Sequence, residues 1–146
     1  MELRSATIED MPVLLLIEQS CFGHERFDRG YIEELMASRD VDVHVAVVKG
    51  SVIGSVMVRH DLRLRLSNLL SLAVLPSEQG KGYSKTMLLK AEQLSKDRGS
   101  GSMRLEVREH NAPAIRLYHN AGYKVVSRLL DFFGKGEDAW LMSKDF

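Results

Sequence analysis

Hydrophobic residues recur along this chain with two periods, one typical of strands and one typical of helices. Valines at alternate positions of 41–47, a Lys-Gly turn and a second apolar run in 52–58 predict a β-hairpin. Apolar residues at helical spacing in 29–37 and 86–96 predict two helices. The full pattern predicts, in chain order, a strand at 2–6, helices at 7–22 and 29–37, strands at 41–47, 52–58 and 64–75, a helix at 86–96, a strand at 103–108, a helix at 111–121 and strands at 123–129 and 138–142.

This order of elements predicts one α/β (α+β) domain spanning 1–146, with a central mixed sheet of about seven strands flanked by four helices. The chain has 146 residues, enough for a proper core. Its composition, 45% hydrophobic and 27% charged, is typical of a globular rather than a disordered protein.

Charge and cysteine content exclude several function classes. Twenty acidic and 20 basic residues cancel, which argues against nucleic acid as a partner. The single cysteine, Cys21, excludes a disulfide framework and a cysteine-rich metal site, and its place on an apolar helix face predicts an inert thiol. No metal site is expected. The chain start lacks a signal-peptide pattern and no apolar run approaches a membrane span, so we expect a soluble cytoplasmic protein without a membrane partner.

The stretch from Leu72 to Lys85 has the pattern strand, glycine turn, helix. This arrangement aims unpaired backbone N–H groups and the positive end of a helix dipole at an anion. Gly80 and Gly82 let the backbone approach a phosphate without a Cβ in the way, and Lys81 and Lys85 add positive charge. The pattern predicts a pyrophosphate-binding loop; the simpler alternative is an ordinary turn, since it is neither a Walker loop nor a full dinucleotide fingerprint.

A second cluster of charge lies at 59–65, where basic residues gather around the expected bend between two strands. The simpler interpretation is a solvated turn with its arginines on the open face. The alternative is an edge that binds an anionic partner.

Two blocks of the sequence together resemble a known family. Residues 79–84 read Gln-Gly-Lys-Gly-Tyr-Ser and resemble the Gln/Arg-x-x-Gly-x-Gly/Ala motif of the GNAT N-acetyltransferase superfamily. Residues 105–118 read Leu-Glu-Val-Arg-Glu-His-Asn-Ala-Pro-Ala-Ile-Arg-Leu-Tyr and resemble its second block. The likeness is greatest to the RimI-like branch, which acetylates protein N-termini and whose ending Gly-Glu-Asp-Ala matches 136–139. The order of elements fits that family from end to end.

The resemblance implies that acetyl-CoA binds in a cleft where two parallel strands splay, here the strands that end near Leu75 and Arg108. Backbone groups of Leu72, Ala73 and Val74 would pair with the pantetheine arm, and a strand N–H would polarise the thioester carbonyl. The other cofactor contacts that the resemblance implies are Gln79, Gly80, Lys81, Gly82, Tyr83, Ser84 and Lys85 at the pyrophosphate and Asn111 at the cofactor arm. Ser84 stands where glycine or alanine is usual, but it is small and we expect binding to survive.

The resemblance also implies two catalytic residues. Glu106 matches the carboxylate proposed as general base in the RimI-like type, and Tyr118 matches the tyrosine near the sulfur, which would act as the acid. Without the family, Glu106 would be a polar residue on the exposed face of a half-buried strand, and Tyr118 a core tyrosine with its hydroxyl at the rim. The family's route is direct attack by the amine, without a covalent enzyme intermediate.

Several kinds of amine could be the acceptor of the acetyl group. An α-amine, with a pKa of about 7.7–8.0 against about 10.4 for lysine, is the easier group to deprotonate, which favours a protein N-terminus. Phe132 and Phe133 stand where the N-terminal acetyltransferase branch often has tyrosines that contact the peptide, and Glu18, Glu33 and Glu34 are candidates to line an acidic pocket. The alternatives are a small-molecule, polyamine or lysine acetyltransferase, or a non-catalytic acyl-CoA-binding module. Either a monomer or a homodimer is compatible with the sequence.

Overall fold

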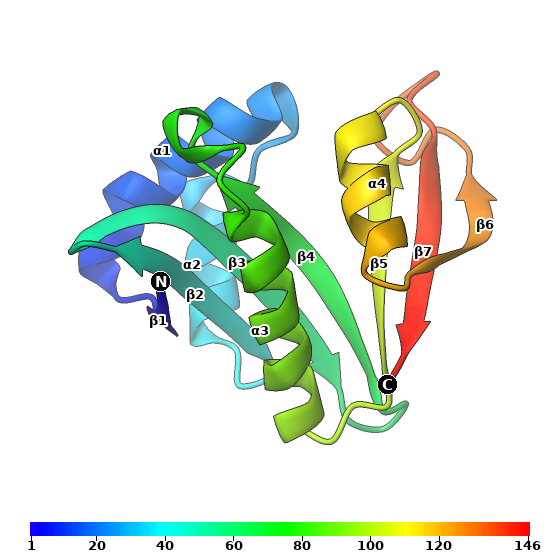
Figure 1. Cartoon of the computed structure of the whole chain (residues 1–146), viewed down its shortest axis with the longest axis horizontal. Helices are drawn as coiled ribbons and strands as arrows, with labels where there is room; N and C mark the ends of the chain where they lie inside the picture. Colours follow the sequence, from blue (N-terminus) through cyan, green and yellow to red (C-terminus); the bar gives the residue numbers. More distant parts are fainter.

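The computed structural model describes residues 1–146, apart from the side chain of His24. Its elements follow the predicted order (Figure 1). The strands are β1 (Glu2–Ser5), β2 (Val41–Val48), β3 (Ser51–Asp61), β4 (Leu66–Val74), β5 (Ser102–Arg108), β6 (Lys124–Leu129) and β7 (Ala139–Asp145). The α-helices are α1 (Met11–Phe22), α2 (Arg29–Ala37), α3 (Tyr83–Asp97) and α4 (Ala112–Asn120). The predicted sheet of seven strands with four helices is therefore confirmed.

One sheet with the strand order β1-β2-β3-β4-β5-β7-β6 organises the chain. Only β4 and β5 run parallel to each other, and every other neighbouring pair is antiparallel. A parallel pair needs a crossover, and α3 supplies it between β4 and β5. The predicted hairpin of β2 and β3 is confirmed, with its turn at Lys49 and Gly50.

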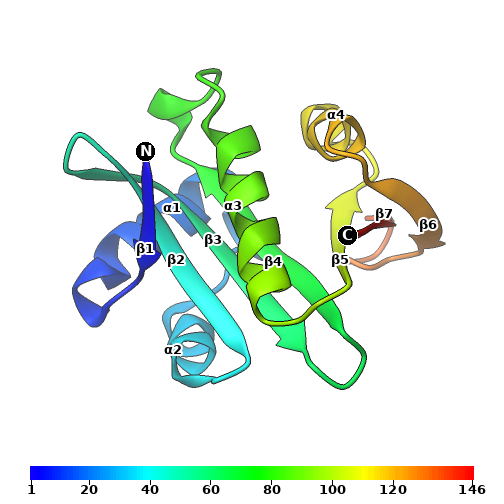
Figure 2. The ribbon, with the colours of Figure 1, turned by 60° about the horizontal axis from the view of Figure 1, so that its bottom comes forward.

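Helices cover both faces of the sheet (Figure 2). On one face, α1 and α2 bury an apolar cluster against β2 and β3; its buried members are Met11, Leu14, Ile32, Leu35, Val41, Val43, Val45 and Met57. On the other face, α3 and α4 pack against β3, β4 and β5 in a larger cluster that includes Met87, Leu88, Ala91, Leu105 and Tyr118. The alternation of β2 therefore serves both faces, because successive side chains of a strand point to opposite sides.

The sheet opens between its two parallel strands. Their pairing covers only Leu66–Leu69 on β4 and Ser102–Leu105 on β5. At that point the register of β4 against β3 shifts, since Val58 pairs with Leu69 but Met57 pairs with Ser71, leaving Leu70 as the extra residue of a bulge. A bulge bends its strand, so the rest of β4 stays with β3 while β5 continues along β7. The predicted splay at strands ending near Leu75 and Arg108 is confirmed.

Some boundaries differ from the predicted ones. Helix α3 begins at Tyr83 rather than at 86, because Gly82 takes the left-handed conformation (φ 85°) and serves as its N-cap. The last strand continues to Asp145, where it still pairs with Ser102. The segment 59–65 is not wholly a solvated turn, since His60 is buried and 2% exposed.

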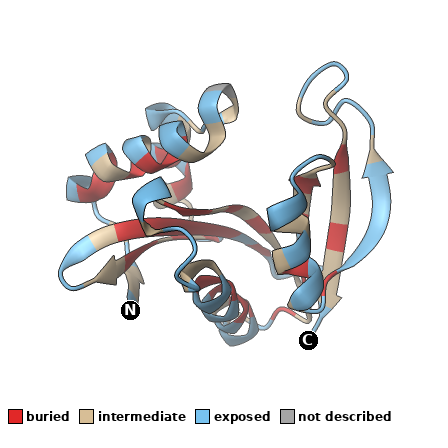
Figure 3. Ribbon diagram, turned by 45° about the horizontal axis from the view of Figure 1, so that its top comes forward, coloured by how far each residue is buried: buried red, intermediate tan, exposed pale blue. Residues whose placement is uncertain are grey.

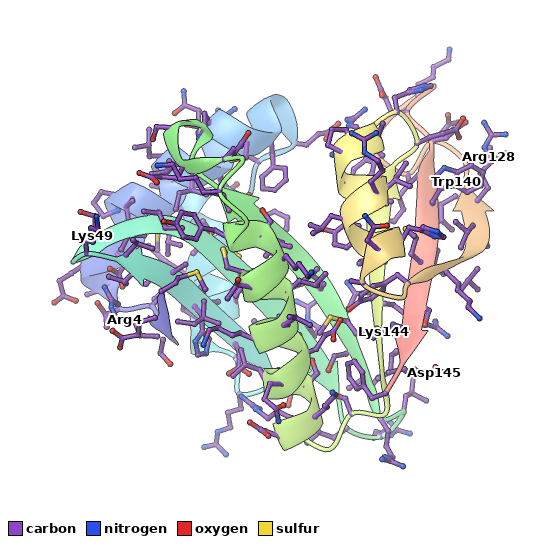
Figure 4. All side chains as sticks on the ribbon, viewed as in Figure 1. Arg4, Lys49, Arg128, Trp140, Lys144 and Asp145 are labelled. Atoms are coloured by element: carbon purple, nitrogen blue, oxygen red, sulfur yellow. The ribbon has the colours of Figure 1, made fainter. Side chains whose placement is uncertain are left out.

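The outer edge of the second half of the sheet is the least buried part of the fold (Figure 3). Every residue of β6 from Lys124 to Arg128 is exposed. Arg128 lies over the ring of Trp140 on β7, 5.9 Å from its centroid (Figure 4). Among the described residues, no helix combines the length and the apolar character needed to cross a membrane.

Candidate active site

A cavity of about 270 Å³ lies where β4 and β5 separate. Its walls come from α1, the segment after it, β4, β5, α4 and the loop between β6 and β7. Its lining residues are Glu18, Cys21, Phe22, Glu25, Phe27, Leu69, Leu70, Ser71, Leu72, Leu105, Glu106, Val107, Arg108, Asn111, Ala114, Tyr118 and Phe133. Both predicted catalytic residues, Glu106 and Tyr118, are among them. The splay of the sheet therefore brings together residues from both halves of the chain.

The cleft edge of β4 offers backbone groups in an alternating pattern. Leu75 N–H donates to Ile53 O of β3 at 2.8 Å, and alternate residues of a strand direct their backbone groups to opposite sides. Ala73 therefore also faces β3, whereas Leu72 and Val74 direct their N–H and C=O groups into the cleft. This corrects the expectation that all three residues offer backbone groups to a ligand, because Ala73 is occupied by β3. Val74 O already accepts hydrogen bonds from the Gln79 amide and the Cys21 thiol, so the groups that remain are the N–H and C=O of Leu72 and the N–H of Val74.

The glycine turn encloses a second hollow of about 160 Å³, at the N-terminal end of α3. Gly80 and Gly82 both have positive φ, 81° and 85°, and a Cβ built on either would meet no atom within 4 Å. The first intrahelical bond of α3 runs from Thr86 N–H to Gly82 O. Within the described part of the chain, the N–H groups of residues 80–85 have no acceptor. Their number and the helix dipole suit an anion with several oxygens, as in a pyrophosphate.

The side chains of this turn divide between the hollow and the loop itself. Ser84 and Lys85 line the hollow, and Tyr83 contributes to it while packing against the core. Gln79 donates from its amide to Val74 O at 2.9 Å, which ties the turn to the end of β4. Lys81 is not among the lining residues, and it pairs at 2.9 Å with Glu78, which does line the hollow. Lys81 therefore offers charge near the hollow rather than a contact within it.

Glu106 stands on β5 with its carboxylate in the cavity. Its closest hydrogen-bond partner is the side-chain amide of Asn68, at 3.4 Å, a long and weak bond. Burial raises the pKa of Glu106 above its ordinary value, and the Asn68 amide offsets part of that rise. A carboxylate with few partners and a raised pKa is a better proton acceptor than a solvated one.

Tyr118 enters the cavity from α4, on the opposite face of the sheet from Glu106. Burial raises the pKa of Tyr118 to about 12, so its hydroxyl stays protonated at neutral pH. The ring packs edge-on against Tyr123, with centroids 5.9 Å apart. Tyr123 donates its own hydroxyl to Glu92 at 2.9 Å, whereas no described residue hydrogen-bonds the Tyr118 hydroxyl. Tyr118 therefore keeps its donor available for a ligand.

Asn111 and Cys21 both line the cavity. Asn111 is the N-cap of α4, and its side-chain oxygen accepts the Ala114 N–H at 3.2 Å, which leaves the NH₂ group to donate towards the cleft. Cys21 donates its thiol to Val74 O at 3.3 Å. Burial raises the pKa of this thiol, as does the nearby charge of Glu18, so the predicted inert thiol is consistent with its surroundings.

Of the three acidic residues proposed for the acceptor pocket, one lines the cavity and two lie outside it. Glu18 lines the cavity and is 1% exposed, as predicted, whereas Glu33 and Glu34 lie on the exposed face of α2, outside the cavity. Glu33 pairs with Arg29 at 2.8 Å. Glu18 repeats with Leu14 and Ile17 on the buried face of α1, and a glutamate on an apolar stripe is the sequence signal that identifies it.

A charged cluster at the mouth of the cavity was not predicted. Arg108, at the end of β5, hydrogen-bonds Glu25 from the segment after α1 and Glu137 from the loop before β7. The Arg108 guanidinium also lies 5.1 Å from the ring centroid of Phe133. Phe133 lines the cavity, while Phe132 packs edge-on against it and is 49% exposed. These residues meet only through the fold, so no local pattern indicates the cluster.

Comparisons with known proteins give a family and a fold. The model of the acetyltransferase (GNAT) family matches residues 11–123. An N-alpha-acetyltransferase of Saccharolobus solfataricus is 29% identical over 153 residues, covering 97% of this chain and 91% of that protein. The ribosomal-protein-S18-alanine N-acetyltransferase from Escherichia coli has a TM-score of 0.87 at 22% identity, covering 99% of this chain and 92% of that one. The spermidine N-acetyltransferase from Vibrio cholerae, solved with CoA and spermine, has a TM-score of 0.85 at 21% identity, covering 99% and 94%.

Proposed function

The chain belongs to the acetyltransferase (GNAT) family, and from this premise we propose that it transfers the acetyl group of acetyl-CoA to the α-amine of a protein N-terminus. The observation that carries the proposal is the splayed pair β4 and β5, whose unpaired ends enclose a cavity with Glu106 on one face and Tyr118 on the other. Acetyl-CoA supplies the activated acyl group as a thioester, and the residues of this chain bind it, orient it and move protons.

The cofactor fits the backbone groups of the cleft. Leu72 presents its N–H and C=O, and Val74 its N–H, to pair with the amides of a pantetheine arm as a further strand would. The N–H groups of residues 80–85 hold the pyrophosphate at the N-terminus of α3, and Lys85 adds a positive charge. The Asn111 side chain donates to the cofactor arm from the opposite wall. A cleft-facing N–H of β4 polarises the thioester carbonyl.

Glu106 and Tyr118 divide the proton chemistry between the two faces. Glu106 accepts a proton from the acceptor, and the neutral nitrogen then attacks the acetyl carbon directly. The new carbon–nitrogen bond forms as the carbon–sulfur bond breaks, and the sulfur leaves with the electron pair. The nitrogen releases its second proton and the thiolate takes one up, so the products are the neutral amide and the CoA thiol. Tyr118, protonated with a pKa of about 12, donates a hydrogen bond to the departing sulfur. A thiol is acidic enough, with a pKa of about 8.5, to leave with that help.

The choice of an α-amine is supported by the relatives and by the cavity. The first relative compared above is named an N-alpha-acetyltransferase, and the Escherichia coli structure is that of a ribosomal-protein-S18-alanine N-acetyltransferase. Glu106, the cavity carboxylate with the weakest hydrogen bond from the described residues, takes the proton in this proposal, and a single carboxylate base suits an α-amine better than a lysine because the α-amine has the lower pKa. A polyamine acceptor is the alternative, since the Vibrio cholerae structure belongs to a spermidine acetyltransferase.

Single-turnover acetyl transfer to a matched panel tests the proposal. The panel contains a peptide with a free N-terminus and no lysine, the same peptide with a blocked N-terminus and one lysine, and spermidine. We expect acetylation of the first, located at the α-nitrogen by tandem mass spectrometry, at a rate well above the other two. Transfer only to lysine or to spermidine would replace the N-terminal function by another acetyltransferase activity, and no transfer to any acceptor would leave a CoA-binding module.

A further inference from the structure

Glu18 is a buried carboxylate without a cationic partner among the described residues. Its side chain is held by two neutral donors: Phe27 N–H donates to one oxygen and the Ser71 hydroxyl to the other, both at 2.9 Å. The residue is 1% exposed, yet it lines the cavity beside β4. A backbone N–H can only donate, so its bond to Glu18 favours the ionised form, while burial without a counter-ion opposes it and raises the pKa of Glu18.

The charges around the cavity are not balanced. Four charged residues line it, of which three are the glutamates Glu18, Glu25 and Glu106 and one is Arg108. Arg108 is already shared between Glu25 and Glu137 at the mouth, so its charge is compensated there. The inner cavity therefore holds two carboxylates, Glu18 and Glu106, whose bonds from the described residues come from neutral groups. An ionised buried carboxylate is stabilised by a cation that enters beside it.

We propose that Glu18 is the positioning residue that holds the acceptor amine in its ammonium form, next to the proton acceptor Glu106. This inference rests on the proposed function and deepens it, because it states how the acceptor is recognised before the chemistry begins. The two carboxylates accept hydrogen bonds from side chains of β4 on either side of the bulge at Leu70, Glu18 from Ser71 and Glu106, more weakly, from Asn68. The bulge thus sets the spacing between the group that binds the ammonium and the group that deprotonates it.

The two roles predict different losses. Removing the charge of Glu18 weakens binding of the ammonium, and removing the charge of Glu106 slows proton transfer while leaving most of the binding. A purely structural role for Glu18, as the brace between α1, Phe27 and Ser71, predicts neither pattern. Loss of a brace would weaken the binding of any acceptor, charged or neutral, by the same factor.

Binding of a peptide and of its des-amino counterpart separates these cases. The counterpart carries a hydrogen atom in place of the N-terminal ammonium, and both are titrated by calorimetry into the protein saturated with CoA, which has no acetyl group to transfer. The wild-type protein is expected to bind the ammonium peptide at least about tenfold more tightly than the neutral one, the ratio for a partly desolvated charge pair. In Glu18→Gln we expect that ratio to fall below about threefold.

The Gln variant keeps an oxygen for Phe27 N–H and an amide for the Ser71 hydroxyl, so the brace survives. Glu106→Gln is the matched variant and is expected to keep the high ratio while losing turnover. Glu33→Gln, outside the cavity, controls for net charge. An unchanged ratio in Glu18→Gln, or a ratio lost in Glu106→Gln instead, would overturn the assignment.

Two further outcomes are distinguishable. If Glu18→Gln does not fold, Glu18→Asp is used: it keeps the charge but withdraws it by one methylene, and it is expected to give an intermediate ratio, whereas an unaltered ratio counts against the proposal. Wild-type turnover on the acceptor panel reports separately on the proposed function. Acetylation of the α-amine with an unchanged binding ratio refutes only the role of Glu18.

Discussion

The two ends of strand β4 differ in their residue types and in their access to a ligand. At the paired end, the His60 Nε2 atom is hydrogen-bonded to an Asp42 carboxylate oxygen at 2.8 Å. The other ring nitrogen of His60, Nδ1, is hydrogen-bonded to the Ser67 hydroxyl at 2.8 Å. These are the residue types of a hydrolase triad, but Ser67 is fully buried and its hydroxyl is shared with Ser100 at 2.6 Å. At the splayed end, Leu72 and Val74 carry no reactive side chain, yet their backbone groups face a cavity. Access to a ligand, rather than residue type, decides which end does chemistry.

At the paired end of β4, hereafter the closed end, the polar side chains hydrogen-bond one another. Arg98 bonds the second oxygen of Asp42 at 2.9 Å and the carbonyl of Arg39 at 2.8 Å, which links α3 to the sheet. Such a network is stabilising when complete and costly when a partner is lost. The splayed end, hereafter the open end, shows the reverse pattern. The N–H groups of residues 80–85 and the Tyr118 hydroxyl have no hydrogen-bond partner among the described residues and can donate to a ligand.

The largest effect is expected from placing a negative charge in the glycine turn of the open end. Gly82→Asp sets a carboxylate against the phosphate site, where like charges repel, and CoA affinity is expected to fall by at least about a hundredfold. Calorimetric titration with CoA measures this loss. Gly50→Asp is the control, because Gly50 has nearly the same positive φ (81°) in the β2–β3 turn and should share the backbone strain without losing CoA. Retained affinity in Gly82→Asp would contradict the anion site.

The hydroxyls of the adjoining tyrosines Tyr118 and Tyr123 are expected to have different roles, the first in turnover and the second in stability. Tyr118→Phe removes a hydroxyl that no described residue bonds, so turnover is expected to fall about a hundredfold while thermal stability and CoA affinity change little. Tyr123→Phe removes the donor to buried Glu92 and is expected to cost about 1–3 kcal/mol of stability with turnover kept. Stopped-flow acetyl transfer and urea unfolding of both variants provide the measurements. Equal rates for Tyr118→Phe and wild type would remove Tyr118 from the reaction.

The smallest effect is expected at the closed end and concerns acid. The hydrogen bond from His60, helped by Arg98, lowers the pKa of Asp42 below its ordinary 3.8. The unfolded chain therefore binds the proton first, and the stability that Asp42 contributes is present above 3.8 and lost as pH falls towards its lowered value. Urea unfolding across this range should show a steeper loss for wild type than for Asp42→Asn. Parallel curves would mean that the network contributes no charge-dependent stability.

Most helices and strands could be predicted from the sequence, because their patterns lie within short segments of the chain. The period of the valines in 41–47 and the helical spacing in 29–37 are properties of short segments, and both elements formed with nearly the predicted bounds. The two family blocks likewise predicted Glu106 and Tyr118, which line the cavity, and the glycine turn, which lines the second hollow.

The rest depended on contacts between distant segments. The bulge at Leu70 arises from the register between β3 and β4, and it decides that Ala73 faces β3 while its neighbours face the cleft. Arg108 meets Glu25 across 83 positions of sequence, and Glu18 meets Ser71 across 53. His60 was hidden in a segment whose charges indicated a solvated turn. None of these pairings has a short-range signature, because only the folded sheet brings the partners together.

The most direct test of the open-end account is the amide NMR spectrum of the protein titrated with acetyl-CoA. If the splayed strands bind the cofactor, we expect large, saturable shifts for the amides of Leu72, Val74 and residues 80–85, with those of Ser67 and Met103 at the paired end unchanged. Shifts confined to other surfaces, or an unaltered spectrum at these amides under saturating acetyl-CoA, would contradict the claim that the splayed strands bind the cofactor.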